Sequence, residues 1–281
     1  KKGSIAFEKS EIKFHLDEAG NRTGVYLKEM KDSNKLIEEF MLLANRAVAE
    51  FCSPPHRPLL SDTEKKIKLP FVYRVHDKPD EEKLGMFAET AKKFGYKMKM
   101  KNEITIAESI NKILSEVIGR PEANMIEMLA IRTMAKAIYT TNNIGHYGLG
   151  FKYYTHFTSP IRRYPDMMVH RLLEKKLTSS ASSDNNQGSR DFFSSPLAQL
   201  ENACKHSSSQ EKLAEEAERA SVKYKQVQYL MNRVGEEFEA VISGVSEWGL
   251  FVELTDSHCE GLIKMKNLTS DYYLLDDKNK R

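Results

Sequence analysis

The spacing of hydrophobic residues along the chain predicts a mixture of strands and helices. Residues 5–27 alternate weakly between apolar and polar side chains and break at residues 17–21, which predicts a hairpin with a long loop. Further along, apolar residues recur every three to four positions, as they do on the buried face of a helix. This period predicts helices over residues 33–51, 80–94, 105–119, 123–139 and 208–234.

The first predicted helix, residues 33–51, carries two apolar rows. Their members are Leu36, Phe40, Leu43 and Ala47, and Ile37, Met41, Ala44 and Val48. Two adjacent rows predict that most of this helix surface is buried. Glu38 and Asn45 lie seven residues apart, so they share a polar stripe beside the apolar face. The periodicity alone favours exposure of that stripe to solvent.

The sequence also indicates where the third predicted helix begins and which residues of the fourth are buried. Thr105 and Glu108 have the spacing of a capping box, so the third helix is expected to begin there. We interpret the methionines of the fourth helix as core side chains rather than cofactor ligands. The residues expected to be buried in that helix are Met125, Ile126, Leu129, Met134 and Ile138.

Two segments after the central part of the chain change in character. Residues 178–189 consist mainly of small polar side chains, which predicts a mobile loop. Residues 235–263 alternate in three short runs, with a turn at Ser246–Glu247 between the first two, and they predict three short strands. A second folding unit is therefore expected to begin at Gly235.

The stretch from Gly145 to Leu173 contains the strongest candidate chemistry. Its first half is rich in aromatic residues and glycine, which predicts a buried strand. Thr158-Ser159-Pro160 has the pattern of a helix start, with Arg162 and Arg163 inside the first turn. Free N–H groups and two guanidinium groups at a helix N-terminus form a candidate phosphate site. From residue types alone, surface ion pairing of both arginines is an equally good interpretation.

Composition limits the class of protein. The 281 residues, 40% hydrophobic and 30% charged, suffice for one large domain and part of another. No apolar run approaches the ~20 residues that span a bilayer, so no membrane segment is expected. The three cysteines, Cys52, Cys204 and Cys259, are widely spread and fit a reducing cytoplasm. The net charge of +3 neither requires nor excludes a polyanionic partner.

A longer sequence motif points to one class of protein. Residues 155–166, Thr-His-Phe-Thr-Ser-Pro-Ile-Arg-Arg-Tyr-Pro-Asp, followed by Val169-His170-Arg171, closely resemble the signature of the ribonuclease II / ribonuclease R family, above all its bacterial ribonuclease R branch. The resemblance extends to an Arg-x-His-Asp-x-Pro stretch at Arg74–Pro79. It implies an α+β fold in which residues 1–234 are the C-terminal portion of an RNB catalytic domain. Residues 235–281 would then begin an S1-type OB-fold.

The same resemblance implies a function. Members of the family hydrolyse single-stranded RNA processively from its 3′ end and release nucleoside 5′-monophosphates, and we expect a monomeric cytoplasmic enzyme of this kind. Two Mg²⁺ ions would hold the attacking water and the leaving oxygen, and they need clustered carboxylates as ligands. The family carries that aspartate cluster earlier in the domain, and this sequence contains nothing comparable. No residue here is therefore predicted to bind metal, and the chain is expected to be a fragment that is inactive alone.

The signature also implies roles for individual residues. Arg162 matches the family's catalytic arginine, which stabilises charge on the scissile phosphate. Arg163 is a weaker candidate for RNA contact, because the family tolerates lysine at that position. Tyr154, Thr158 and Ser159 are candidate contacts to the RNA backbone.

The helix over residues 33–51 resembles a family helix whose glutamate faces the bound RNA. Glu39 is the better match to that glutamate, with Glu38 close behind, and the resemblance implies that Asn45 of the same motif also contacts RNA. Two further pairs receive structural interpretations. His76 beside Asp77 is interpreted as a structural histidine, and Asp166 and His170, four residues apart, are expected to brace one another.

The C-terminal segment resembles the first three strands of an S1-type RNA-binding barrel. Trp248 and Phe251 match the two aromatic residues of its nucleic-acid face, and Lys264 occupies the position of its histidine. Stacking of an aromatic side chain on a base is worth ~1–3 kcal/mol. The alternative, a position in the barrel core, is less favoured for Trp248 because this residue lies on a predicted turn.

Two other functions are weighed against the exoribonuclease. A non-catalytic RNA-binding or scaffold protein with the same fold would bind RNA without cleaving it. A metal hydrolase that uses His146, His156 and His170 is disfavoured, because their spacing is not that of helical metal ligands. His146 and His156 also alternate with aromatic residues, as core residues do.

Overall fold

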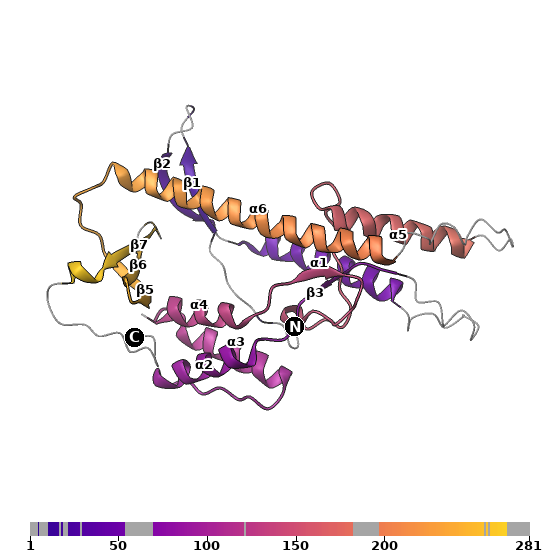
Figure 1. Cartoon of the computed structure of the whole chain (residues 1–281), viewed down its shortest axis with the longest axis horizontal. Helices are drawn as coiled ribbons and strands as arrows, with labels where there is room; N and C mark the ends of the chain where they lie inside the picture. The colour runs from indigo at the N-terminus through magenta and orange to yellow at the C-terminus, as the bar shows by residue number, and fades with distance from the viewer. Residues whose placement is uncertain are drawn as a thin grey trace. The chain divides into compact units, whose positions relative to one another are not determined.

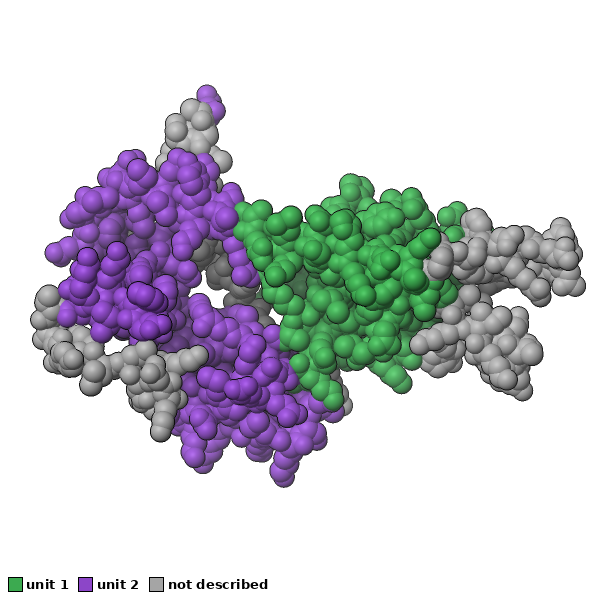
Figure 2. Space-filling view, in the orientation of Figure 1, with its two compact units in different colours: residues 1–4, 31–78, 135–217 green, residues 5–30, 79–134, 218–281 purple. Residues whose placement is uncertain are grey.

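The computed structural model describes residues 5, 11–16, 18, 22–28, 30–53, 70–120, 122–181, 197–255, 257 and 259–268. The chain forms two compact units, coloured green and purple in Figure 2. Unit 1 is built mainly from Lys31–Lys78 and Ala135–Ala217, and unit 2 from Ile5–Met30, Pro79–Met134 and Glu218–Arg281. Each unit therefore joins segments that are distant in the sequence.

Unit 1 is organised around a small antiparallel sheet. Strand β3 (Tyr73–Val75) pairs with β4 (Ile138–Thr140), and Arg74 lies opposite Tyr139. Three helices, drawn in Figure 1, contribute side chains to its core: α1 (Asp32–Cys52), α5 (Tyr164–Ala181) and the first part of α6 (Leu197–Met231). The core residues are Ala49, Cys52, Phe71, Val72, Tyr73, Val75, Tyr139, Met168, Val169 and Cys204.

Unit 2 contains a three-helix cluster and two separate sheets. The helices are α2 (Glu81–Lys93), α3 (Glu103–Val117) and α4 (Ala123–Thr133). Their core comprises Leu84, Phe87, Ala91, Tyr96, Ile110, Ile113, Val117, Ile126 and Ala130. One sheet is the hairpin of β1 (Glu11–Leu16) and β2 (Arg22–Lys28), and the other is the antiparallel meander of β5 (Ala240–Ser246), β6 (Gly249–Leu254) and β7 (Glu260–Lys264).

Most predicted elements are confirmed, with shifts at their ends. The hairpin, the helices α1 and α2, and the three C-terminal strands lie where the periodicity predicts them. The third helix starts two residues before Thr105, and its capping box is formed by Asn102 with Thr105 rather than by Thr105 with Glu108. The last long helix starts at Leu197 instead of near Ser208, and its added first part packs Leu200, Ala203 and Cys204 into the core of unit 1.

The fourth predicted helix is wrong over its second half. Helix α4 ends at Thr133, and Ile138 belongs to strand β4 with 47% of its side chain exposed. Backbone pairing explains the difference, because β3 gains its hydrogen-bonding partner strand from these residues. The apolar period over residues 123–139 does not distinguish a helix followed by a strand from one long helix.

In the first half of helix α1, the apolar side chains are more exposed than predicted. Its apolar residues Leu36, Phe40 and Leu43 are 57–60% exposed, whereas the polar Asn45 is buried. Glu38 is exposed, as expected for the polar stripe. The prediction that most of this helix is buried is therefore wrong for its first half, and a polar side chain lies inside where apolar ones were expected.

Some predictions fall partly or wholly outside the described residues. One is the S1-type segment expected over residues 235–281, of which residues 256, 258 and 269–281 lie outside the described part. The polar loop predicted from Thr178 begins later, since α5 continues to Ala181, and residues 182–189 are outside the described part. Among the residues that are described, no helix is long and apolar enough to cross a membrane.

Gly249 and Gly85 provide a matched test of the unit 2 fold. Gly249 has φ +146°, and a Cβ at this position would lie 2.0 Å from the Ile263 carbonyl oxygen. We expect Gly249→Ala to reduce the free energy of unfolding by at least about 2 kcal/mol, because neither strand backbone can move freely. Gly85, inside α2, has nothing within 4 Å of such a Cβ, and Gly85→Ala should stabilise by about 0.5–1 kcal/mol. Chemical denaturation followed by circular dichroism and Trp248 fluorescence measures both; equal effects would contradict the strand geometry.

Candidate functional site

The segment that carries the signature motif runs along the edge of β3 without forming a strand. The Arg74 N–H donates to the Tyr154 carbonyl at 3.0 Å, and the Thr155 hydroxyl donates to the Val72 carbonyl at 2.8 Å. The strand predicted for the preceding residues is wrong. They form single bridges and one short 3-10 turn between two glycines with left-handed backbone, Gly145 (φ 85°) and Gly150 (φ 67°). These two residues interrupt any regular ladder.

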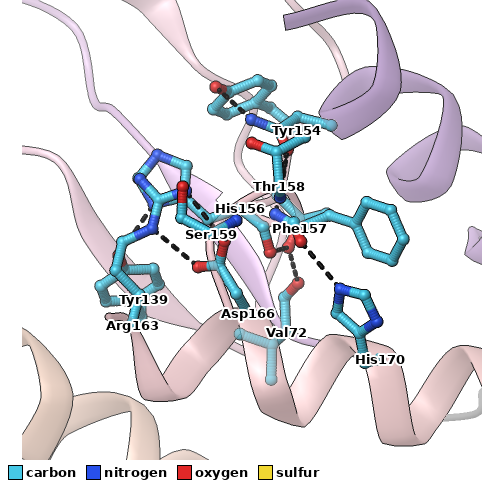
Figure 3. Close-up of polar contacts among 12 residues, drawn as sticks. Val72, Tyr139, Tyr154, His156, Phe157, Thr158, Ser159, Arg163, Asp166 and His170 are labelled. Carbon is cyan, nitrogen blue, oxygen red and sulfur yellow. Dashed lines mark hydrogen bonds and ion pairs between the residues drawn. The ribbon is translucent and has the colours of Figure 1, made fainter. Parts of the chain in front are cut away.

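The helix predicted to start at Thr158-Ser159-Pro160 begins later. Helix α5 starts at Tyr164, and residues 160–162 form a turn before it, so the arginines precede the helix. The Asp166 carboxylate, 0% exposed, explains this arrangement. It accepts the Ser159 N–H at 2.8 Å and two N–H groups of the Arg163 guanidinium at 2.9 and 2.8 Å, as Figure 3 shows. These bonds bend the chain into a turn that a helix would not permit.

The backbone N–H groups that were predicted to face a phosphate already donate hydrogen bonds to side chains of the protein. Phe157 and Thr158 donate their backbone N–H groups to the side-chain oxygen of Asn45, at 2.9 and 3.2 Å. Ser159 donates its N–H to Asp166. Three consecutive amides are thus satisfied by two buried side chains. A phosphate at this loop would be bound by side chains rather than by these backbone groups.

His170 does not pair with Asp166, so that expectation is wrong. Its Nε2–H donates to the Phe157 carbonyl at 2.9 Å, and its ring stacks on the Phe157 ring with centroids 4.1 Å apart. Figure 3 shows His170 and Asp166 reaching different parts of the loop from helix α5. Both residues therefore secure the loop, each through its own contact.

Arg162 and Arg163 have different environments. Arg163 is paired with Asp166 through two parallel hydrogen bonds, which neutralises its charge locally. Arg162 is exposed. Among the residues that the structure describes, none forms a hydrogen bond or an ion pair with its guanidinium group. Of the two adjacent arginines, only Arg162 is available to an external anion in this arrangement.

A partly buried polar cluster lies beside the loop. The Arg74 guanidinium pairs with Glu211 of α6 at 2.6 Å and lies 4.5 Å from the centre of the Tyr139 ring. The Tyr139 hydroxyl shares a 2.8 Å hydrogen bond with Nδ1 of His156. Burial raises the pKa of Tyr139 to about 12, so this hydroxyl stays protonated. Sequence reasoning missed Glu211 and Tyr139, although Arg74 belongs to a recognised motif.

The histidines of this region are held neutral. Burial, together with the positive charges of Arg163 and Arg74, lowers the pKa of His156 to about 2. Burial and the neighbouring His76 lower the pKa of His146 to about 3. The rings of His76 and His146 stack with centroids 5.1 Å apart, and Nδ1 of His76 accepts the Gly148 N–H at 3.2 Å. His76 is therefore structural as predicted, but it acts through Gly148 and His146 rather than Asp77.

Helix α6 holds β4 in place through side-chain acceptors. One oxygen of Glu201 accepts the Thr141 N–H at 2.8 Å and the Thr141 hydroxyl at 2.7 Å. Burial raises the pKa of Glu201, but these hydrogen bonds and one from Thr140 outweigh it, so the net pKa is lowered. Ser208 accepts the Tyr139 N–H at 2.9 Å. These contacts fix the strand against which Arg74 is placed.

The remaining predicted contacts differ in accessibility. Tyr154 is 4% exposed, and its hydroxyl accepts a hydrogen bond from Asn45, so it lies behind the loop surface. Ser159 and Thr158 are partly exposed, and the buried Thr158 hydroxyl oxygen has no hydrogen-bond partner within the described part of the chain. Glu38 and Glu39 are both exposed on α1.

The candidate residues of unit 2 belong to the β5-β6-β7 meander. Trp248 is 72% exposed on the turn between β5 and β6, and Phe251 is 44% exposed on β6. Phe251 lies opposite Leu262, and Lys264 lies opposite Gly249, so these positions share one face of the meander. Trp248 accepts the Met265 N–H at its carbonyl, which holds the turn beside the end of β7.

Lowering the pH tests the buried histidines. Between about pH 6.5 and about pH 3, the unfolded chain binds protons that folded His156 and His146 cannot bind, so stability falls as the pH falls. Each histidine contributes up to ~1.4 kcal/mol per pH unit in this window. We expect His156→Gln to flatten this slope by about one proton in urea unfolding measured from about pH 7 to pH 4. His206→Gln, at an exposed position of α6, should leave the slope unchanged; identical slopes in both variants would contradict burial of a neutral His156.

Known proteins similar to this chain point to one family. Residues 1–179 match the family model of the RNB domain. Ribonuclease R of Aquifex aeolicus is 41% identical over 275 residues, which cover 98% of this chain and 36% of that protein. Ribonuclease R of Escherichia coli is 32% identical over 280 residues, covering 100% of this chain and 33% of that protein. A structure titled as Mycoplasma genitalium RNase R in complex with ribose methylated single-stranded RNA matches with a TM-score of 0.83 at 27% identity, over 99% of this chain and 41% of that one.

The chain spans about a third of the length of the curated relatives that it matches. The family model covers well over half of the chain and includes α1, β3, β4 and the signature loop. This span contains the residues that hold and flank Arg162. The chain therefore belongs to the RNB domain family.

Proposed function

We propose that this chain forms the phosphate-facing part of a 3′-to-5′ exoribonuclease that hydrolyses single-stranded RNA processively to nucleoside 5′-monophosphates. Relatives named ribonuclease R, and a similar structure of such a protein in complex with single-stranded RNA, support the reaction and the substrate class. The observation that carries the proposal is the exposure of Arg162 at a loop whose other charged groups are paired.

In this proposal Arg162 contacts the scissile phosphate. Its planar guanidinium donates two parallel hydrogen bonds to non-bridging oxygens and stabilises the negative charge that develops during hydrolysis. Arg163 contributes mainly to loop shape, because its charge is matched by the buried Asp166. Ser159, which is partly exposed beside Arg162, is proposed to contact the RNA backbone through its hydroxyl group. The Thr158 hydroxyl oxygen is buried, so no RNA contact is proposed for it.

The glutamates of α1 are proposed as a further RNA-facing element. Glu39 is the preferred residue and Glu38 the second choice, and both lie on the exposed half of the helix. A carboxylate repels phosphate, so its use is to accept hydrogen bonds from sugar hydroxyl or base N–H groups. Contacts to the 2′-hydroxyl group of the sugar would distinguish RNA from DNA, which lacks this group.

The described residues do not fit a magnesium site. No group of three or more His, Cys, Asp or Glu side chains in the described part of the chain is arranged to hold a metal ion. We therefore assign no metal ligand and no metal-dependent step to these residues. Their proposed contribution is the binding and charge stabilisation of the phosphate.

Residues 235–281 are proposed to begin an S1-type OB-fold that follows the catalytic portion, residues 1–234. The β5-β6-β7 meander supports this, since it leaves the aromatic side chains of Trp248 and Phe251 exposed. Trp248 and Phe251 would stack on bases, and Lys264 would contact phosphate. A monomer in a reducing cytoplasm fits the three buried cysteines, which form no disulfide.

The role of Arg162 is tested by Arg162→Ala in the natural protein that contains this sequence. We expect turnover of a single-stranded RNA to fall by a factor on the order of 100–1,000, as it does when one charge-stabilising donor is removed. The measurement is the release of nucleoside 5′-monophosphates, resolved by chromatography, with Mg²⁺ present. Arg132→Ala serves as the control, because Arg132 is an exposed arginine whose guanidinium donates a hydrogen bond to the Met128 sulfur on the same helix.

The outcomes separate the two functions under consideration. Retained turnover in Arg162→Ala would remove this arginine from the mechanism. RNA binding without any cleavage by the unmodified natural protein would instead favour a non-catalytic RNA-binding or scaffold protein. This chain by itself should release no monophosphates, so release by the purified chain would overturn the assignment of the metal step to other polypeptide.

The proposed stacking surface is tested by Trp248→Ala. Loss of one stacked base should weaken binding of single-stranded RNA by ~1–3 kcal/mol, which corresponds to roughly 5- to 150-fold in Kd. Fluorescence anisotropy of a labelled oligonucleotide measures the change at fixed salt. Ile144→Ala, at an exposed apolar position of unit 1, should leave Kd unchanged. An unchanged Kd for Trp248→Ala would contradict the stacking role.

A further inference from the structure

Asn45 connects helix α1 to the signature loop from inside the protein. Its side chain is 3% exposed, although most of the preceding helix is exposed. The side-chain oxygen accepts the N–H groups of Phe157 and Thr158, and the side-chain nitrogen donates to the Tyr154 hydroxyl at 3.1 Å. One amide therefore holds two points of a loop that lies 109–113 residues further along the chain.

The segment held by Asn45 leads directly to Arg162. The next residue, Ser159, is held at its N–H by Asp166, and its carbonyl accepts the N–H groups of Arg162 at 3.3 Å and Arg163 at 3.1 Å. A continuous series of hydrogen bonds thus runs from Asn45 through the loop to the turn that carries Arg162. Loss of the first acceptor would leave two amides without partners and free the start of this series.

Burial determines which role Asn45 can play. A residue that is 3% exposed and already bonded through both polar atoms has no group to offer to RNA. We propose that Asn45 is a positioning residue, which holds the loop so that the Arg162 guanidinium faces the scissile phosphate. This inference rests on the proposed function of Arg162 and replaces the direct RNA contact that the sequence motif implies for Asn45.

The central variant is Asn45→Leu, which keeps the branched shape of the side chain but removes both hydrogen-bonding atoms. In the natural protein that contains this chain, kcat for RNA should fall by a factor on the order of 100, as expected for a misplaced catalytic group. KM should change little, because no RNA contact is removed. Asn45→Asp keeps the oxygen that accepts the two amides and should recover most of kcat. If Asn45→Leu is unfolded by circular dichroism, Asn45→Ser, whose side chain is too short to reach both amides, takes its place.

Val75→Ala is the matched control for lost stability. Val75 is buried in the same core, and the change removes methyl groups without touching any loop amide. It should lower the unfolding midpoint while leaving kcat close to that of the natural protein. Hydrogen exchange of peptides that contain residues 157–158 should accelerate in Asn45→Leu and remain unchanged in Val75→Ala.

A double-mutant cycle with Arg162→Ala tests whether Asn45 acts through Arg162. If Asn45 acts through Arg162, Asn45→Leu should lower single-turnover rates in the natural background and have no further effect when Arg162 is already absent. Equal losses in both backgrounds, a loss confined to KM, or unchanged exchange at residues 157–158 would overturn the positioning role. Full turnover in Arg162→Ala alone would overturn the proposed function and this inference together, whereas additive losses would remove only the inference.

Discussion

Hydrogen bonds from three consecutive backbone amides to two buried side chains hold the signature loop, and the arrangement of unit 1 depends on them. Asn45 accepts the amides of Phe157 and Thr158, and Asp166 accepts that of Ser159. Each buried amide without a partner would cost about 1–3 kcal/mol. Helices α1 and α5 must therefore remain beside the loop, and the core around β3 keeps them there.

The distribution of charge follows from this constraint. The carboxylate of Asp166 is fully buried, so it requires a positively charged partner. The guanidinium group of Arg163 is that partner. Arg74 is balanced by Glu211 in the same way. The positive charges of these arginines and the burial of the site keep His156 unprotonated. The guanidinium of Arg162 is exposed, whereas that of the adjacent Arg163 is paired, and exposure is the condition for binding an external phosphate.

Much of the fold could be predicted from local pattern, and the errors have a common cause. The hairpin, α2 and the three C-terminal strands were predictable, because their periodicity or turn residues lie within a few positions of each other. The predicted helix over residues 123–139 was divided by the need of β3 for a partner strand. In α1 the apolar Phe40 is exposed and the polar Asn45 is buried, because the distant loop, rather than the helix pattern, determines which face is needed.

The sequence by itself determined the order of most elements, the family, and Arg162 as the leading candidate for phosphate contact, since all of these depend on contiguous residues. Only the tertiary structure decided that Arg163 is paired with Asp166, that the loop amides are occupied, and that Asn45 lies behind the loop rather than on its surface. The physical reason is that a buried hydrogen bond between residues more than a hundred positions apart depends on which faces of the chain meet, and local periodicity does not carry that information.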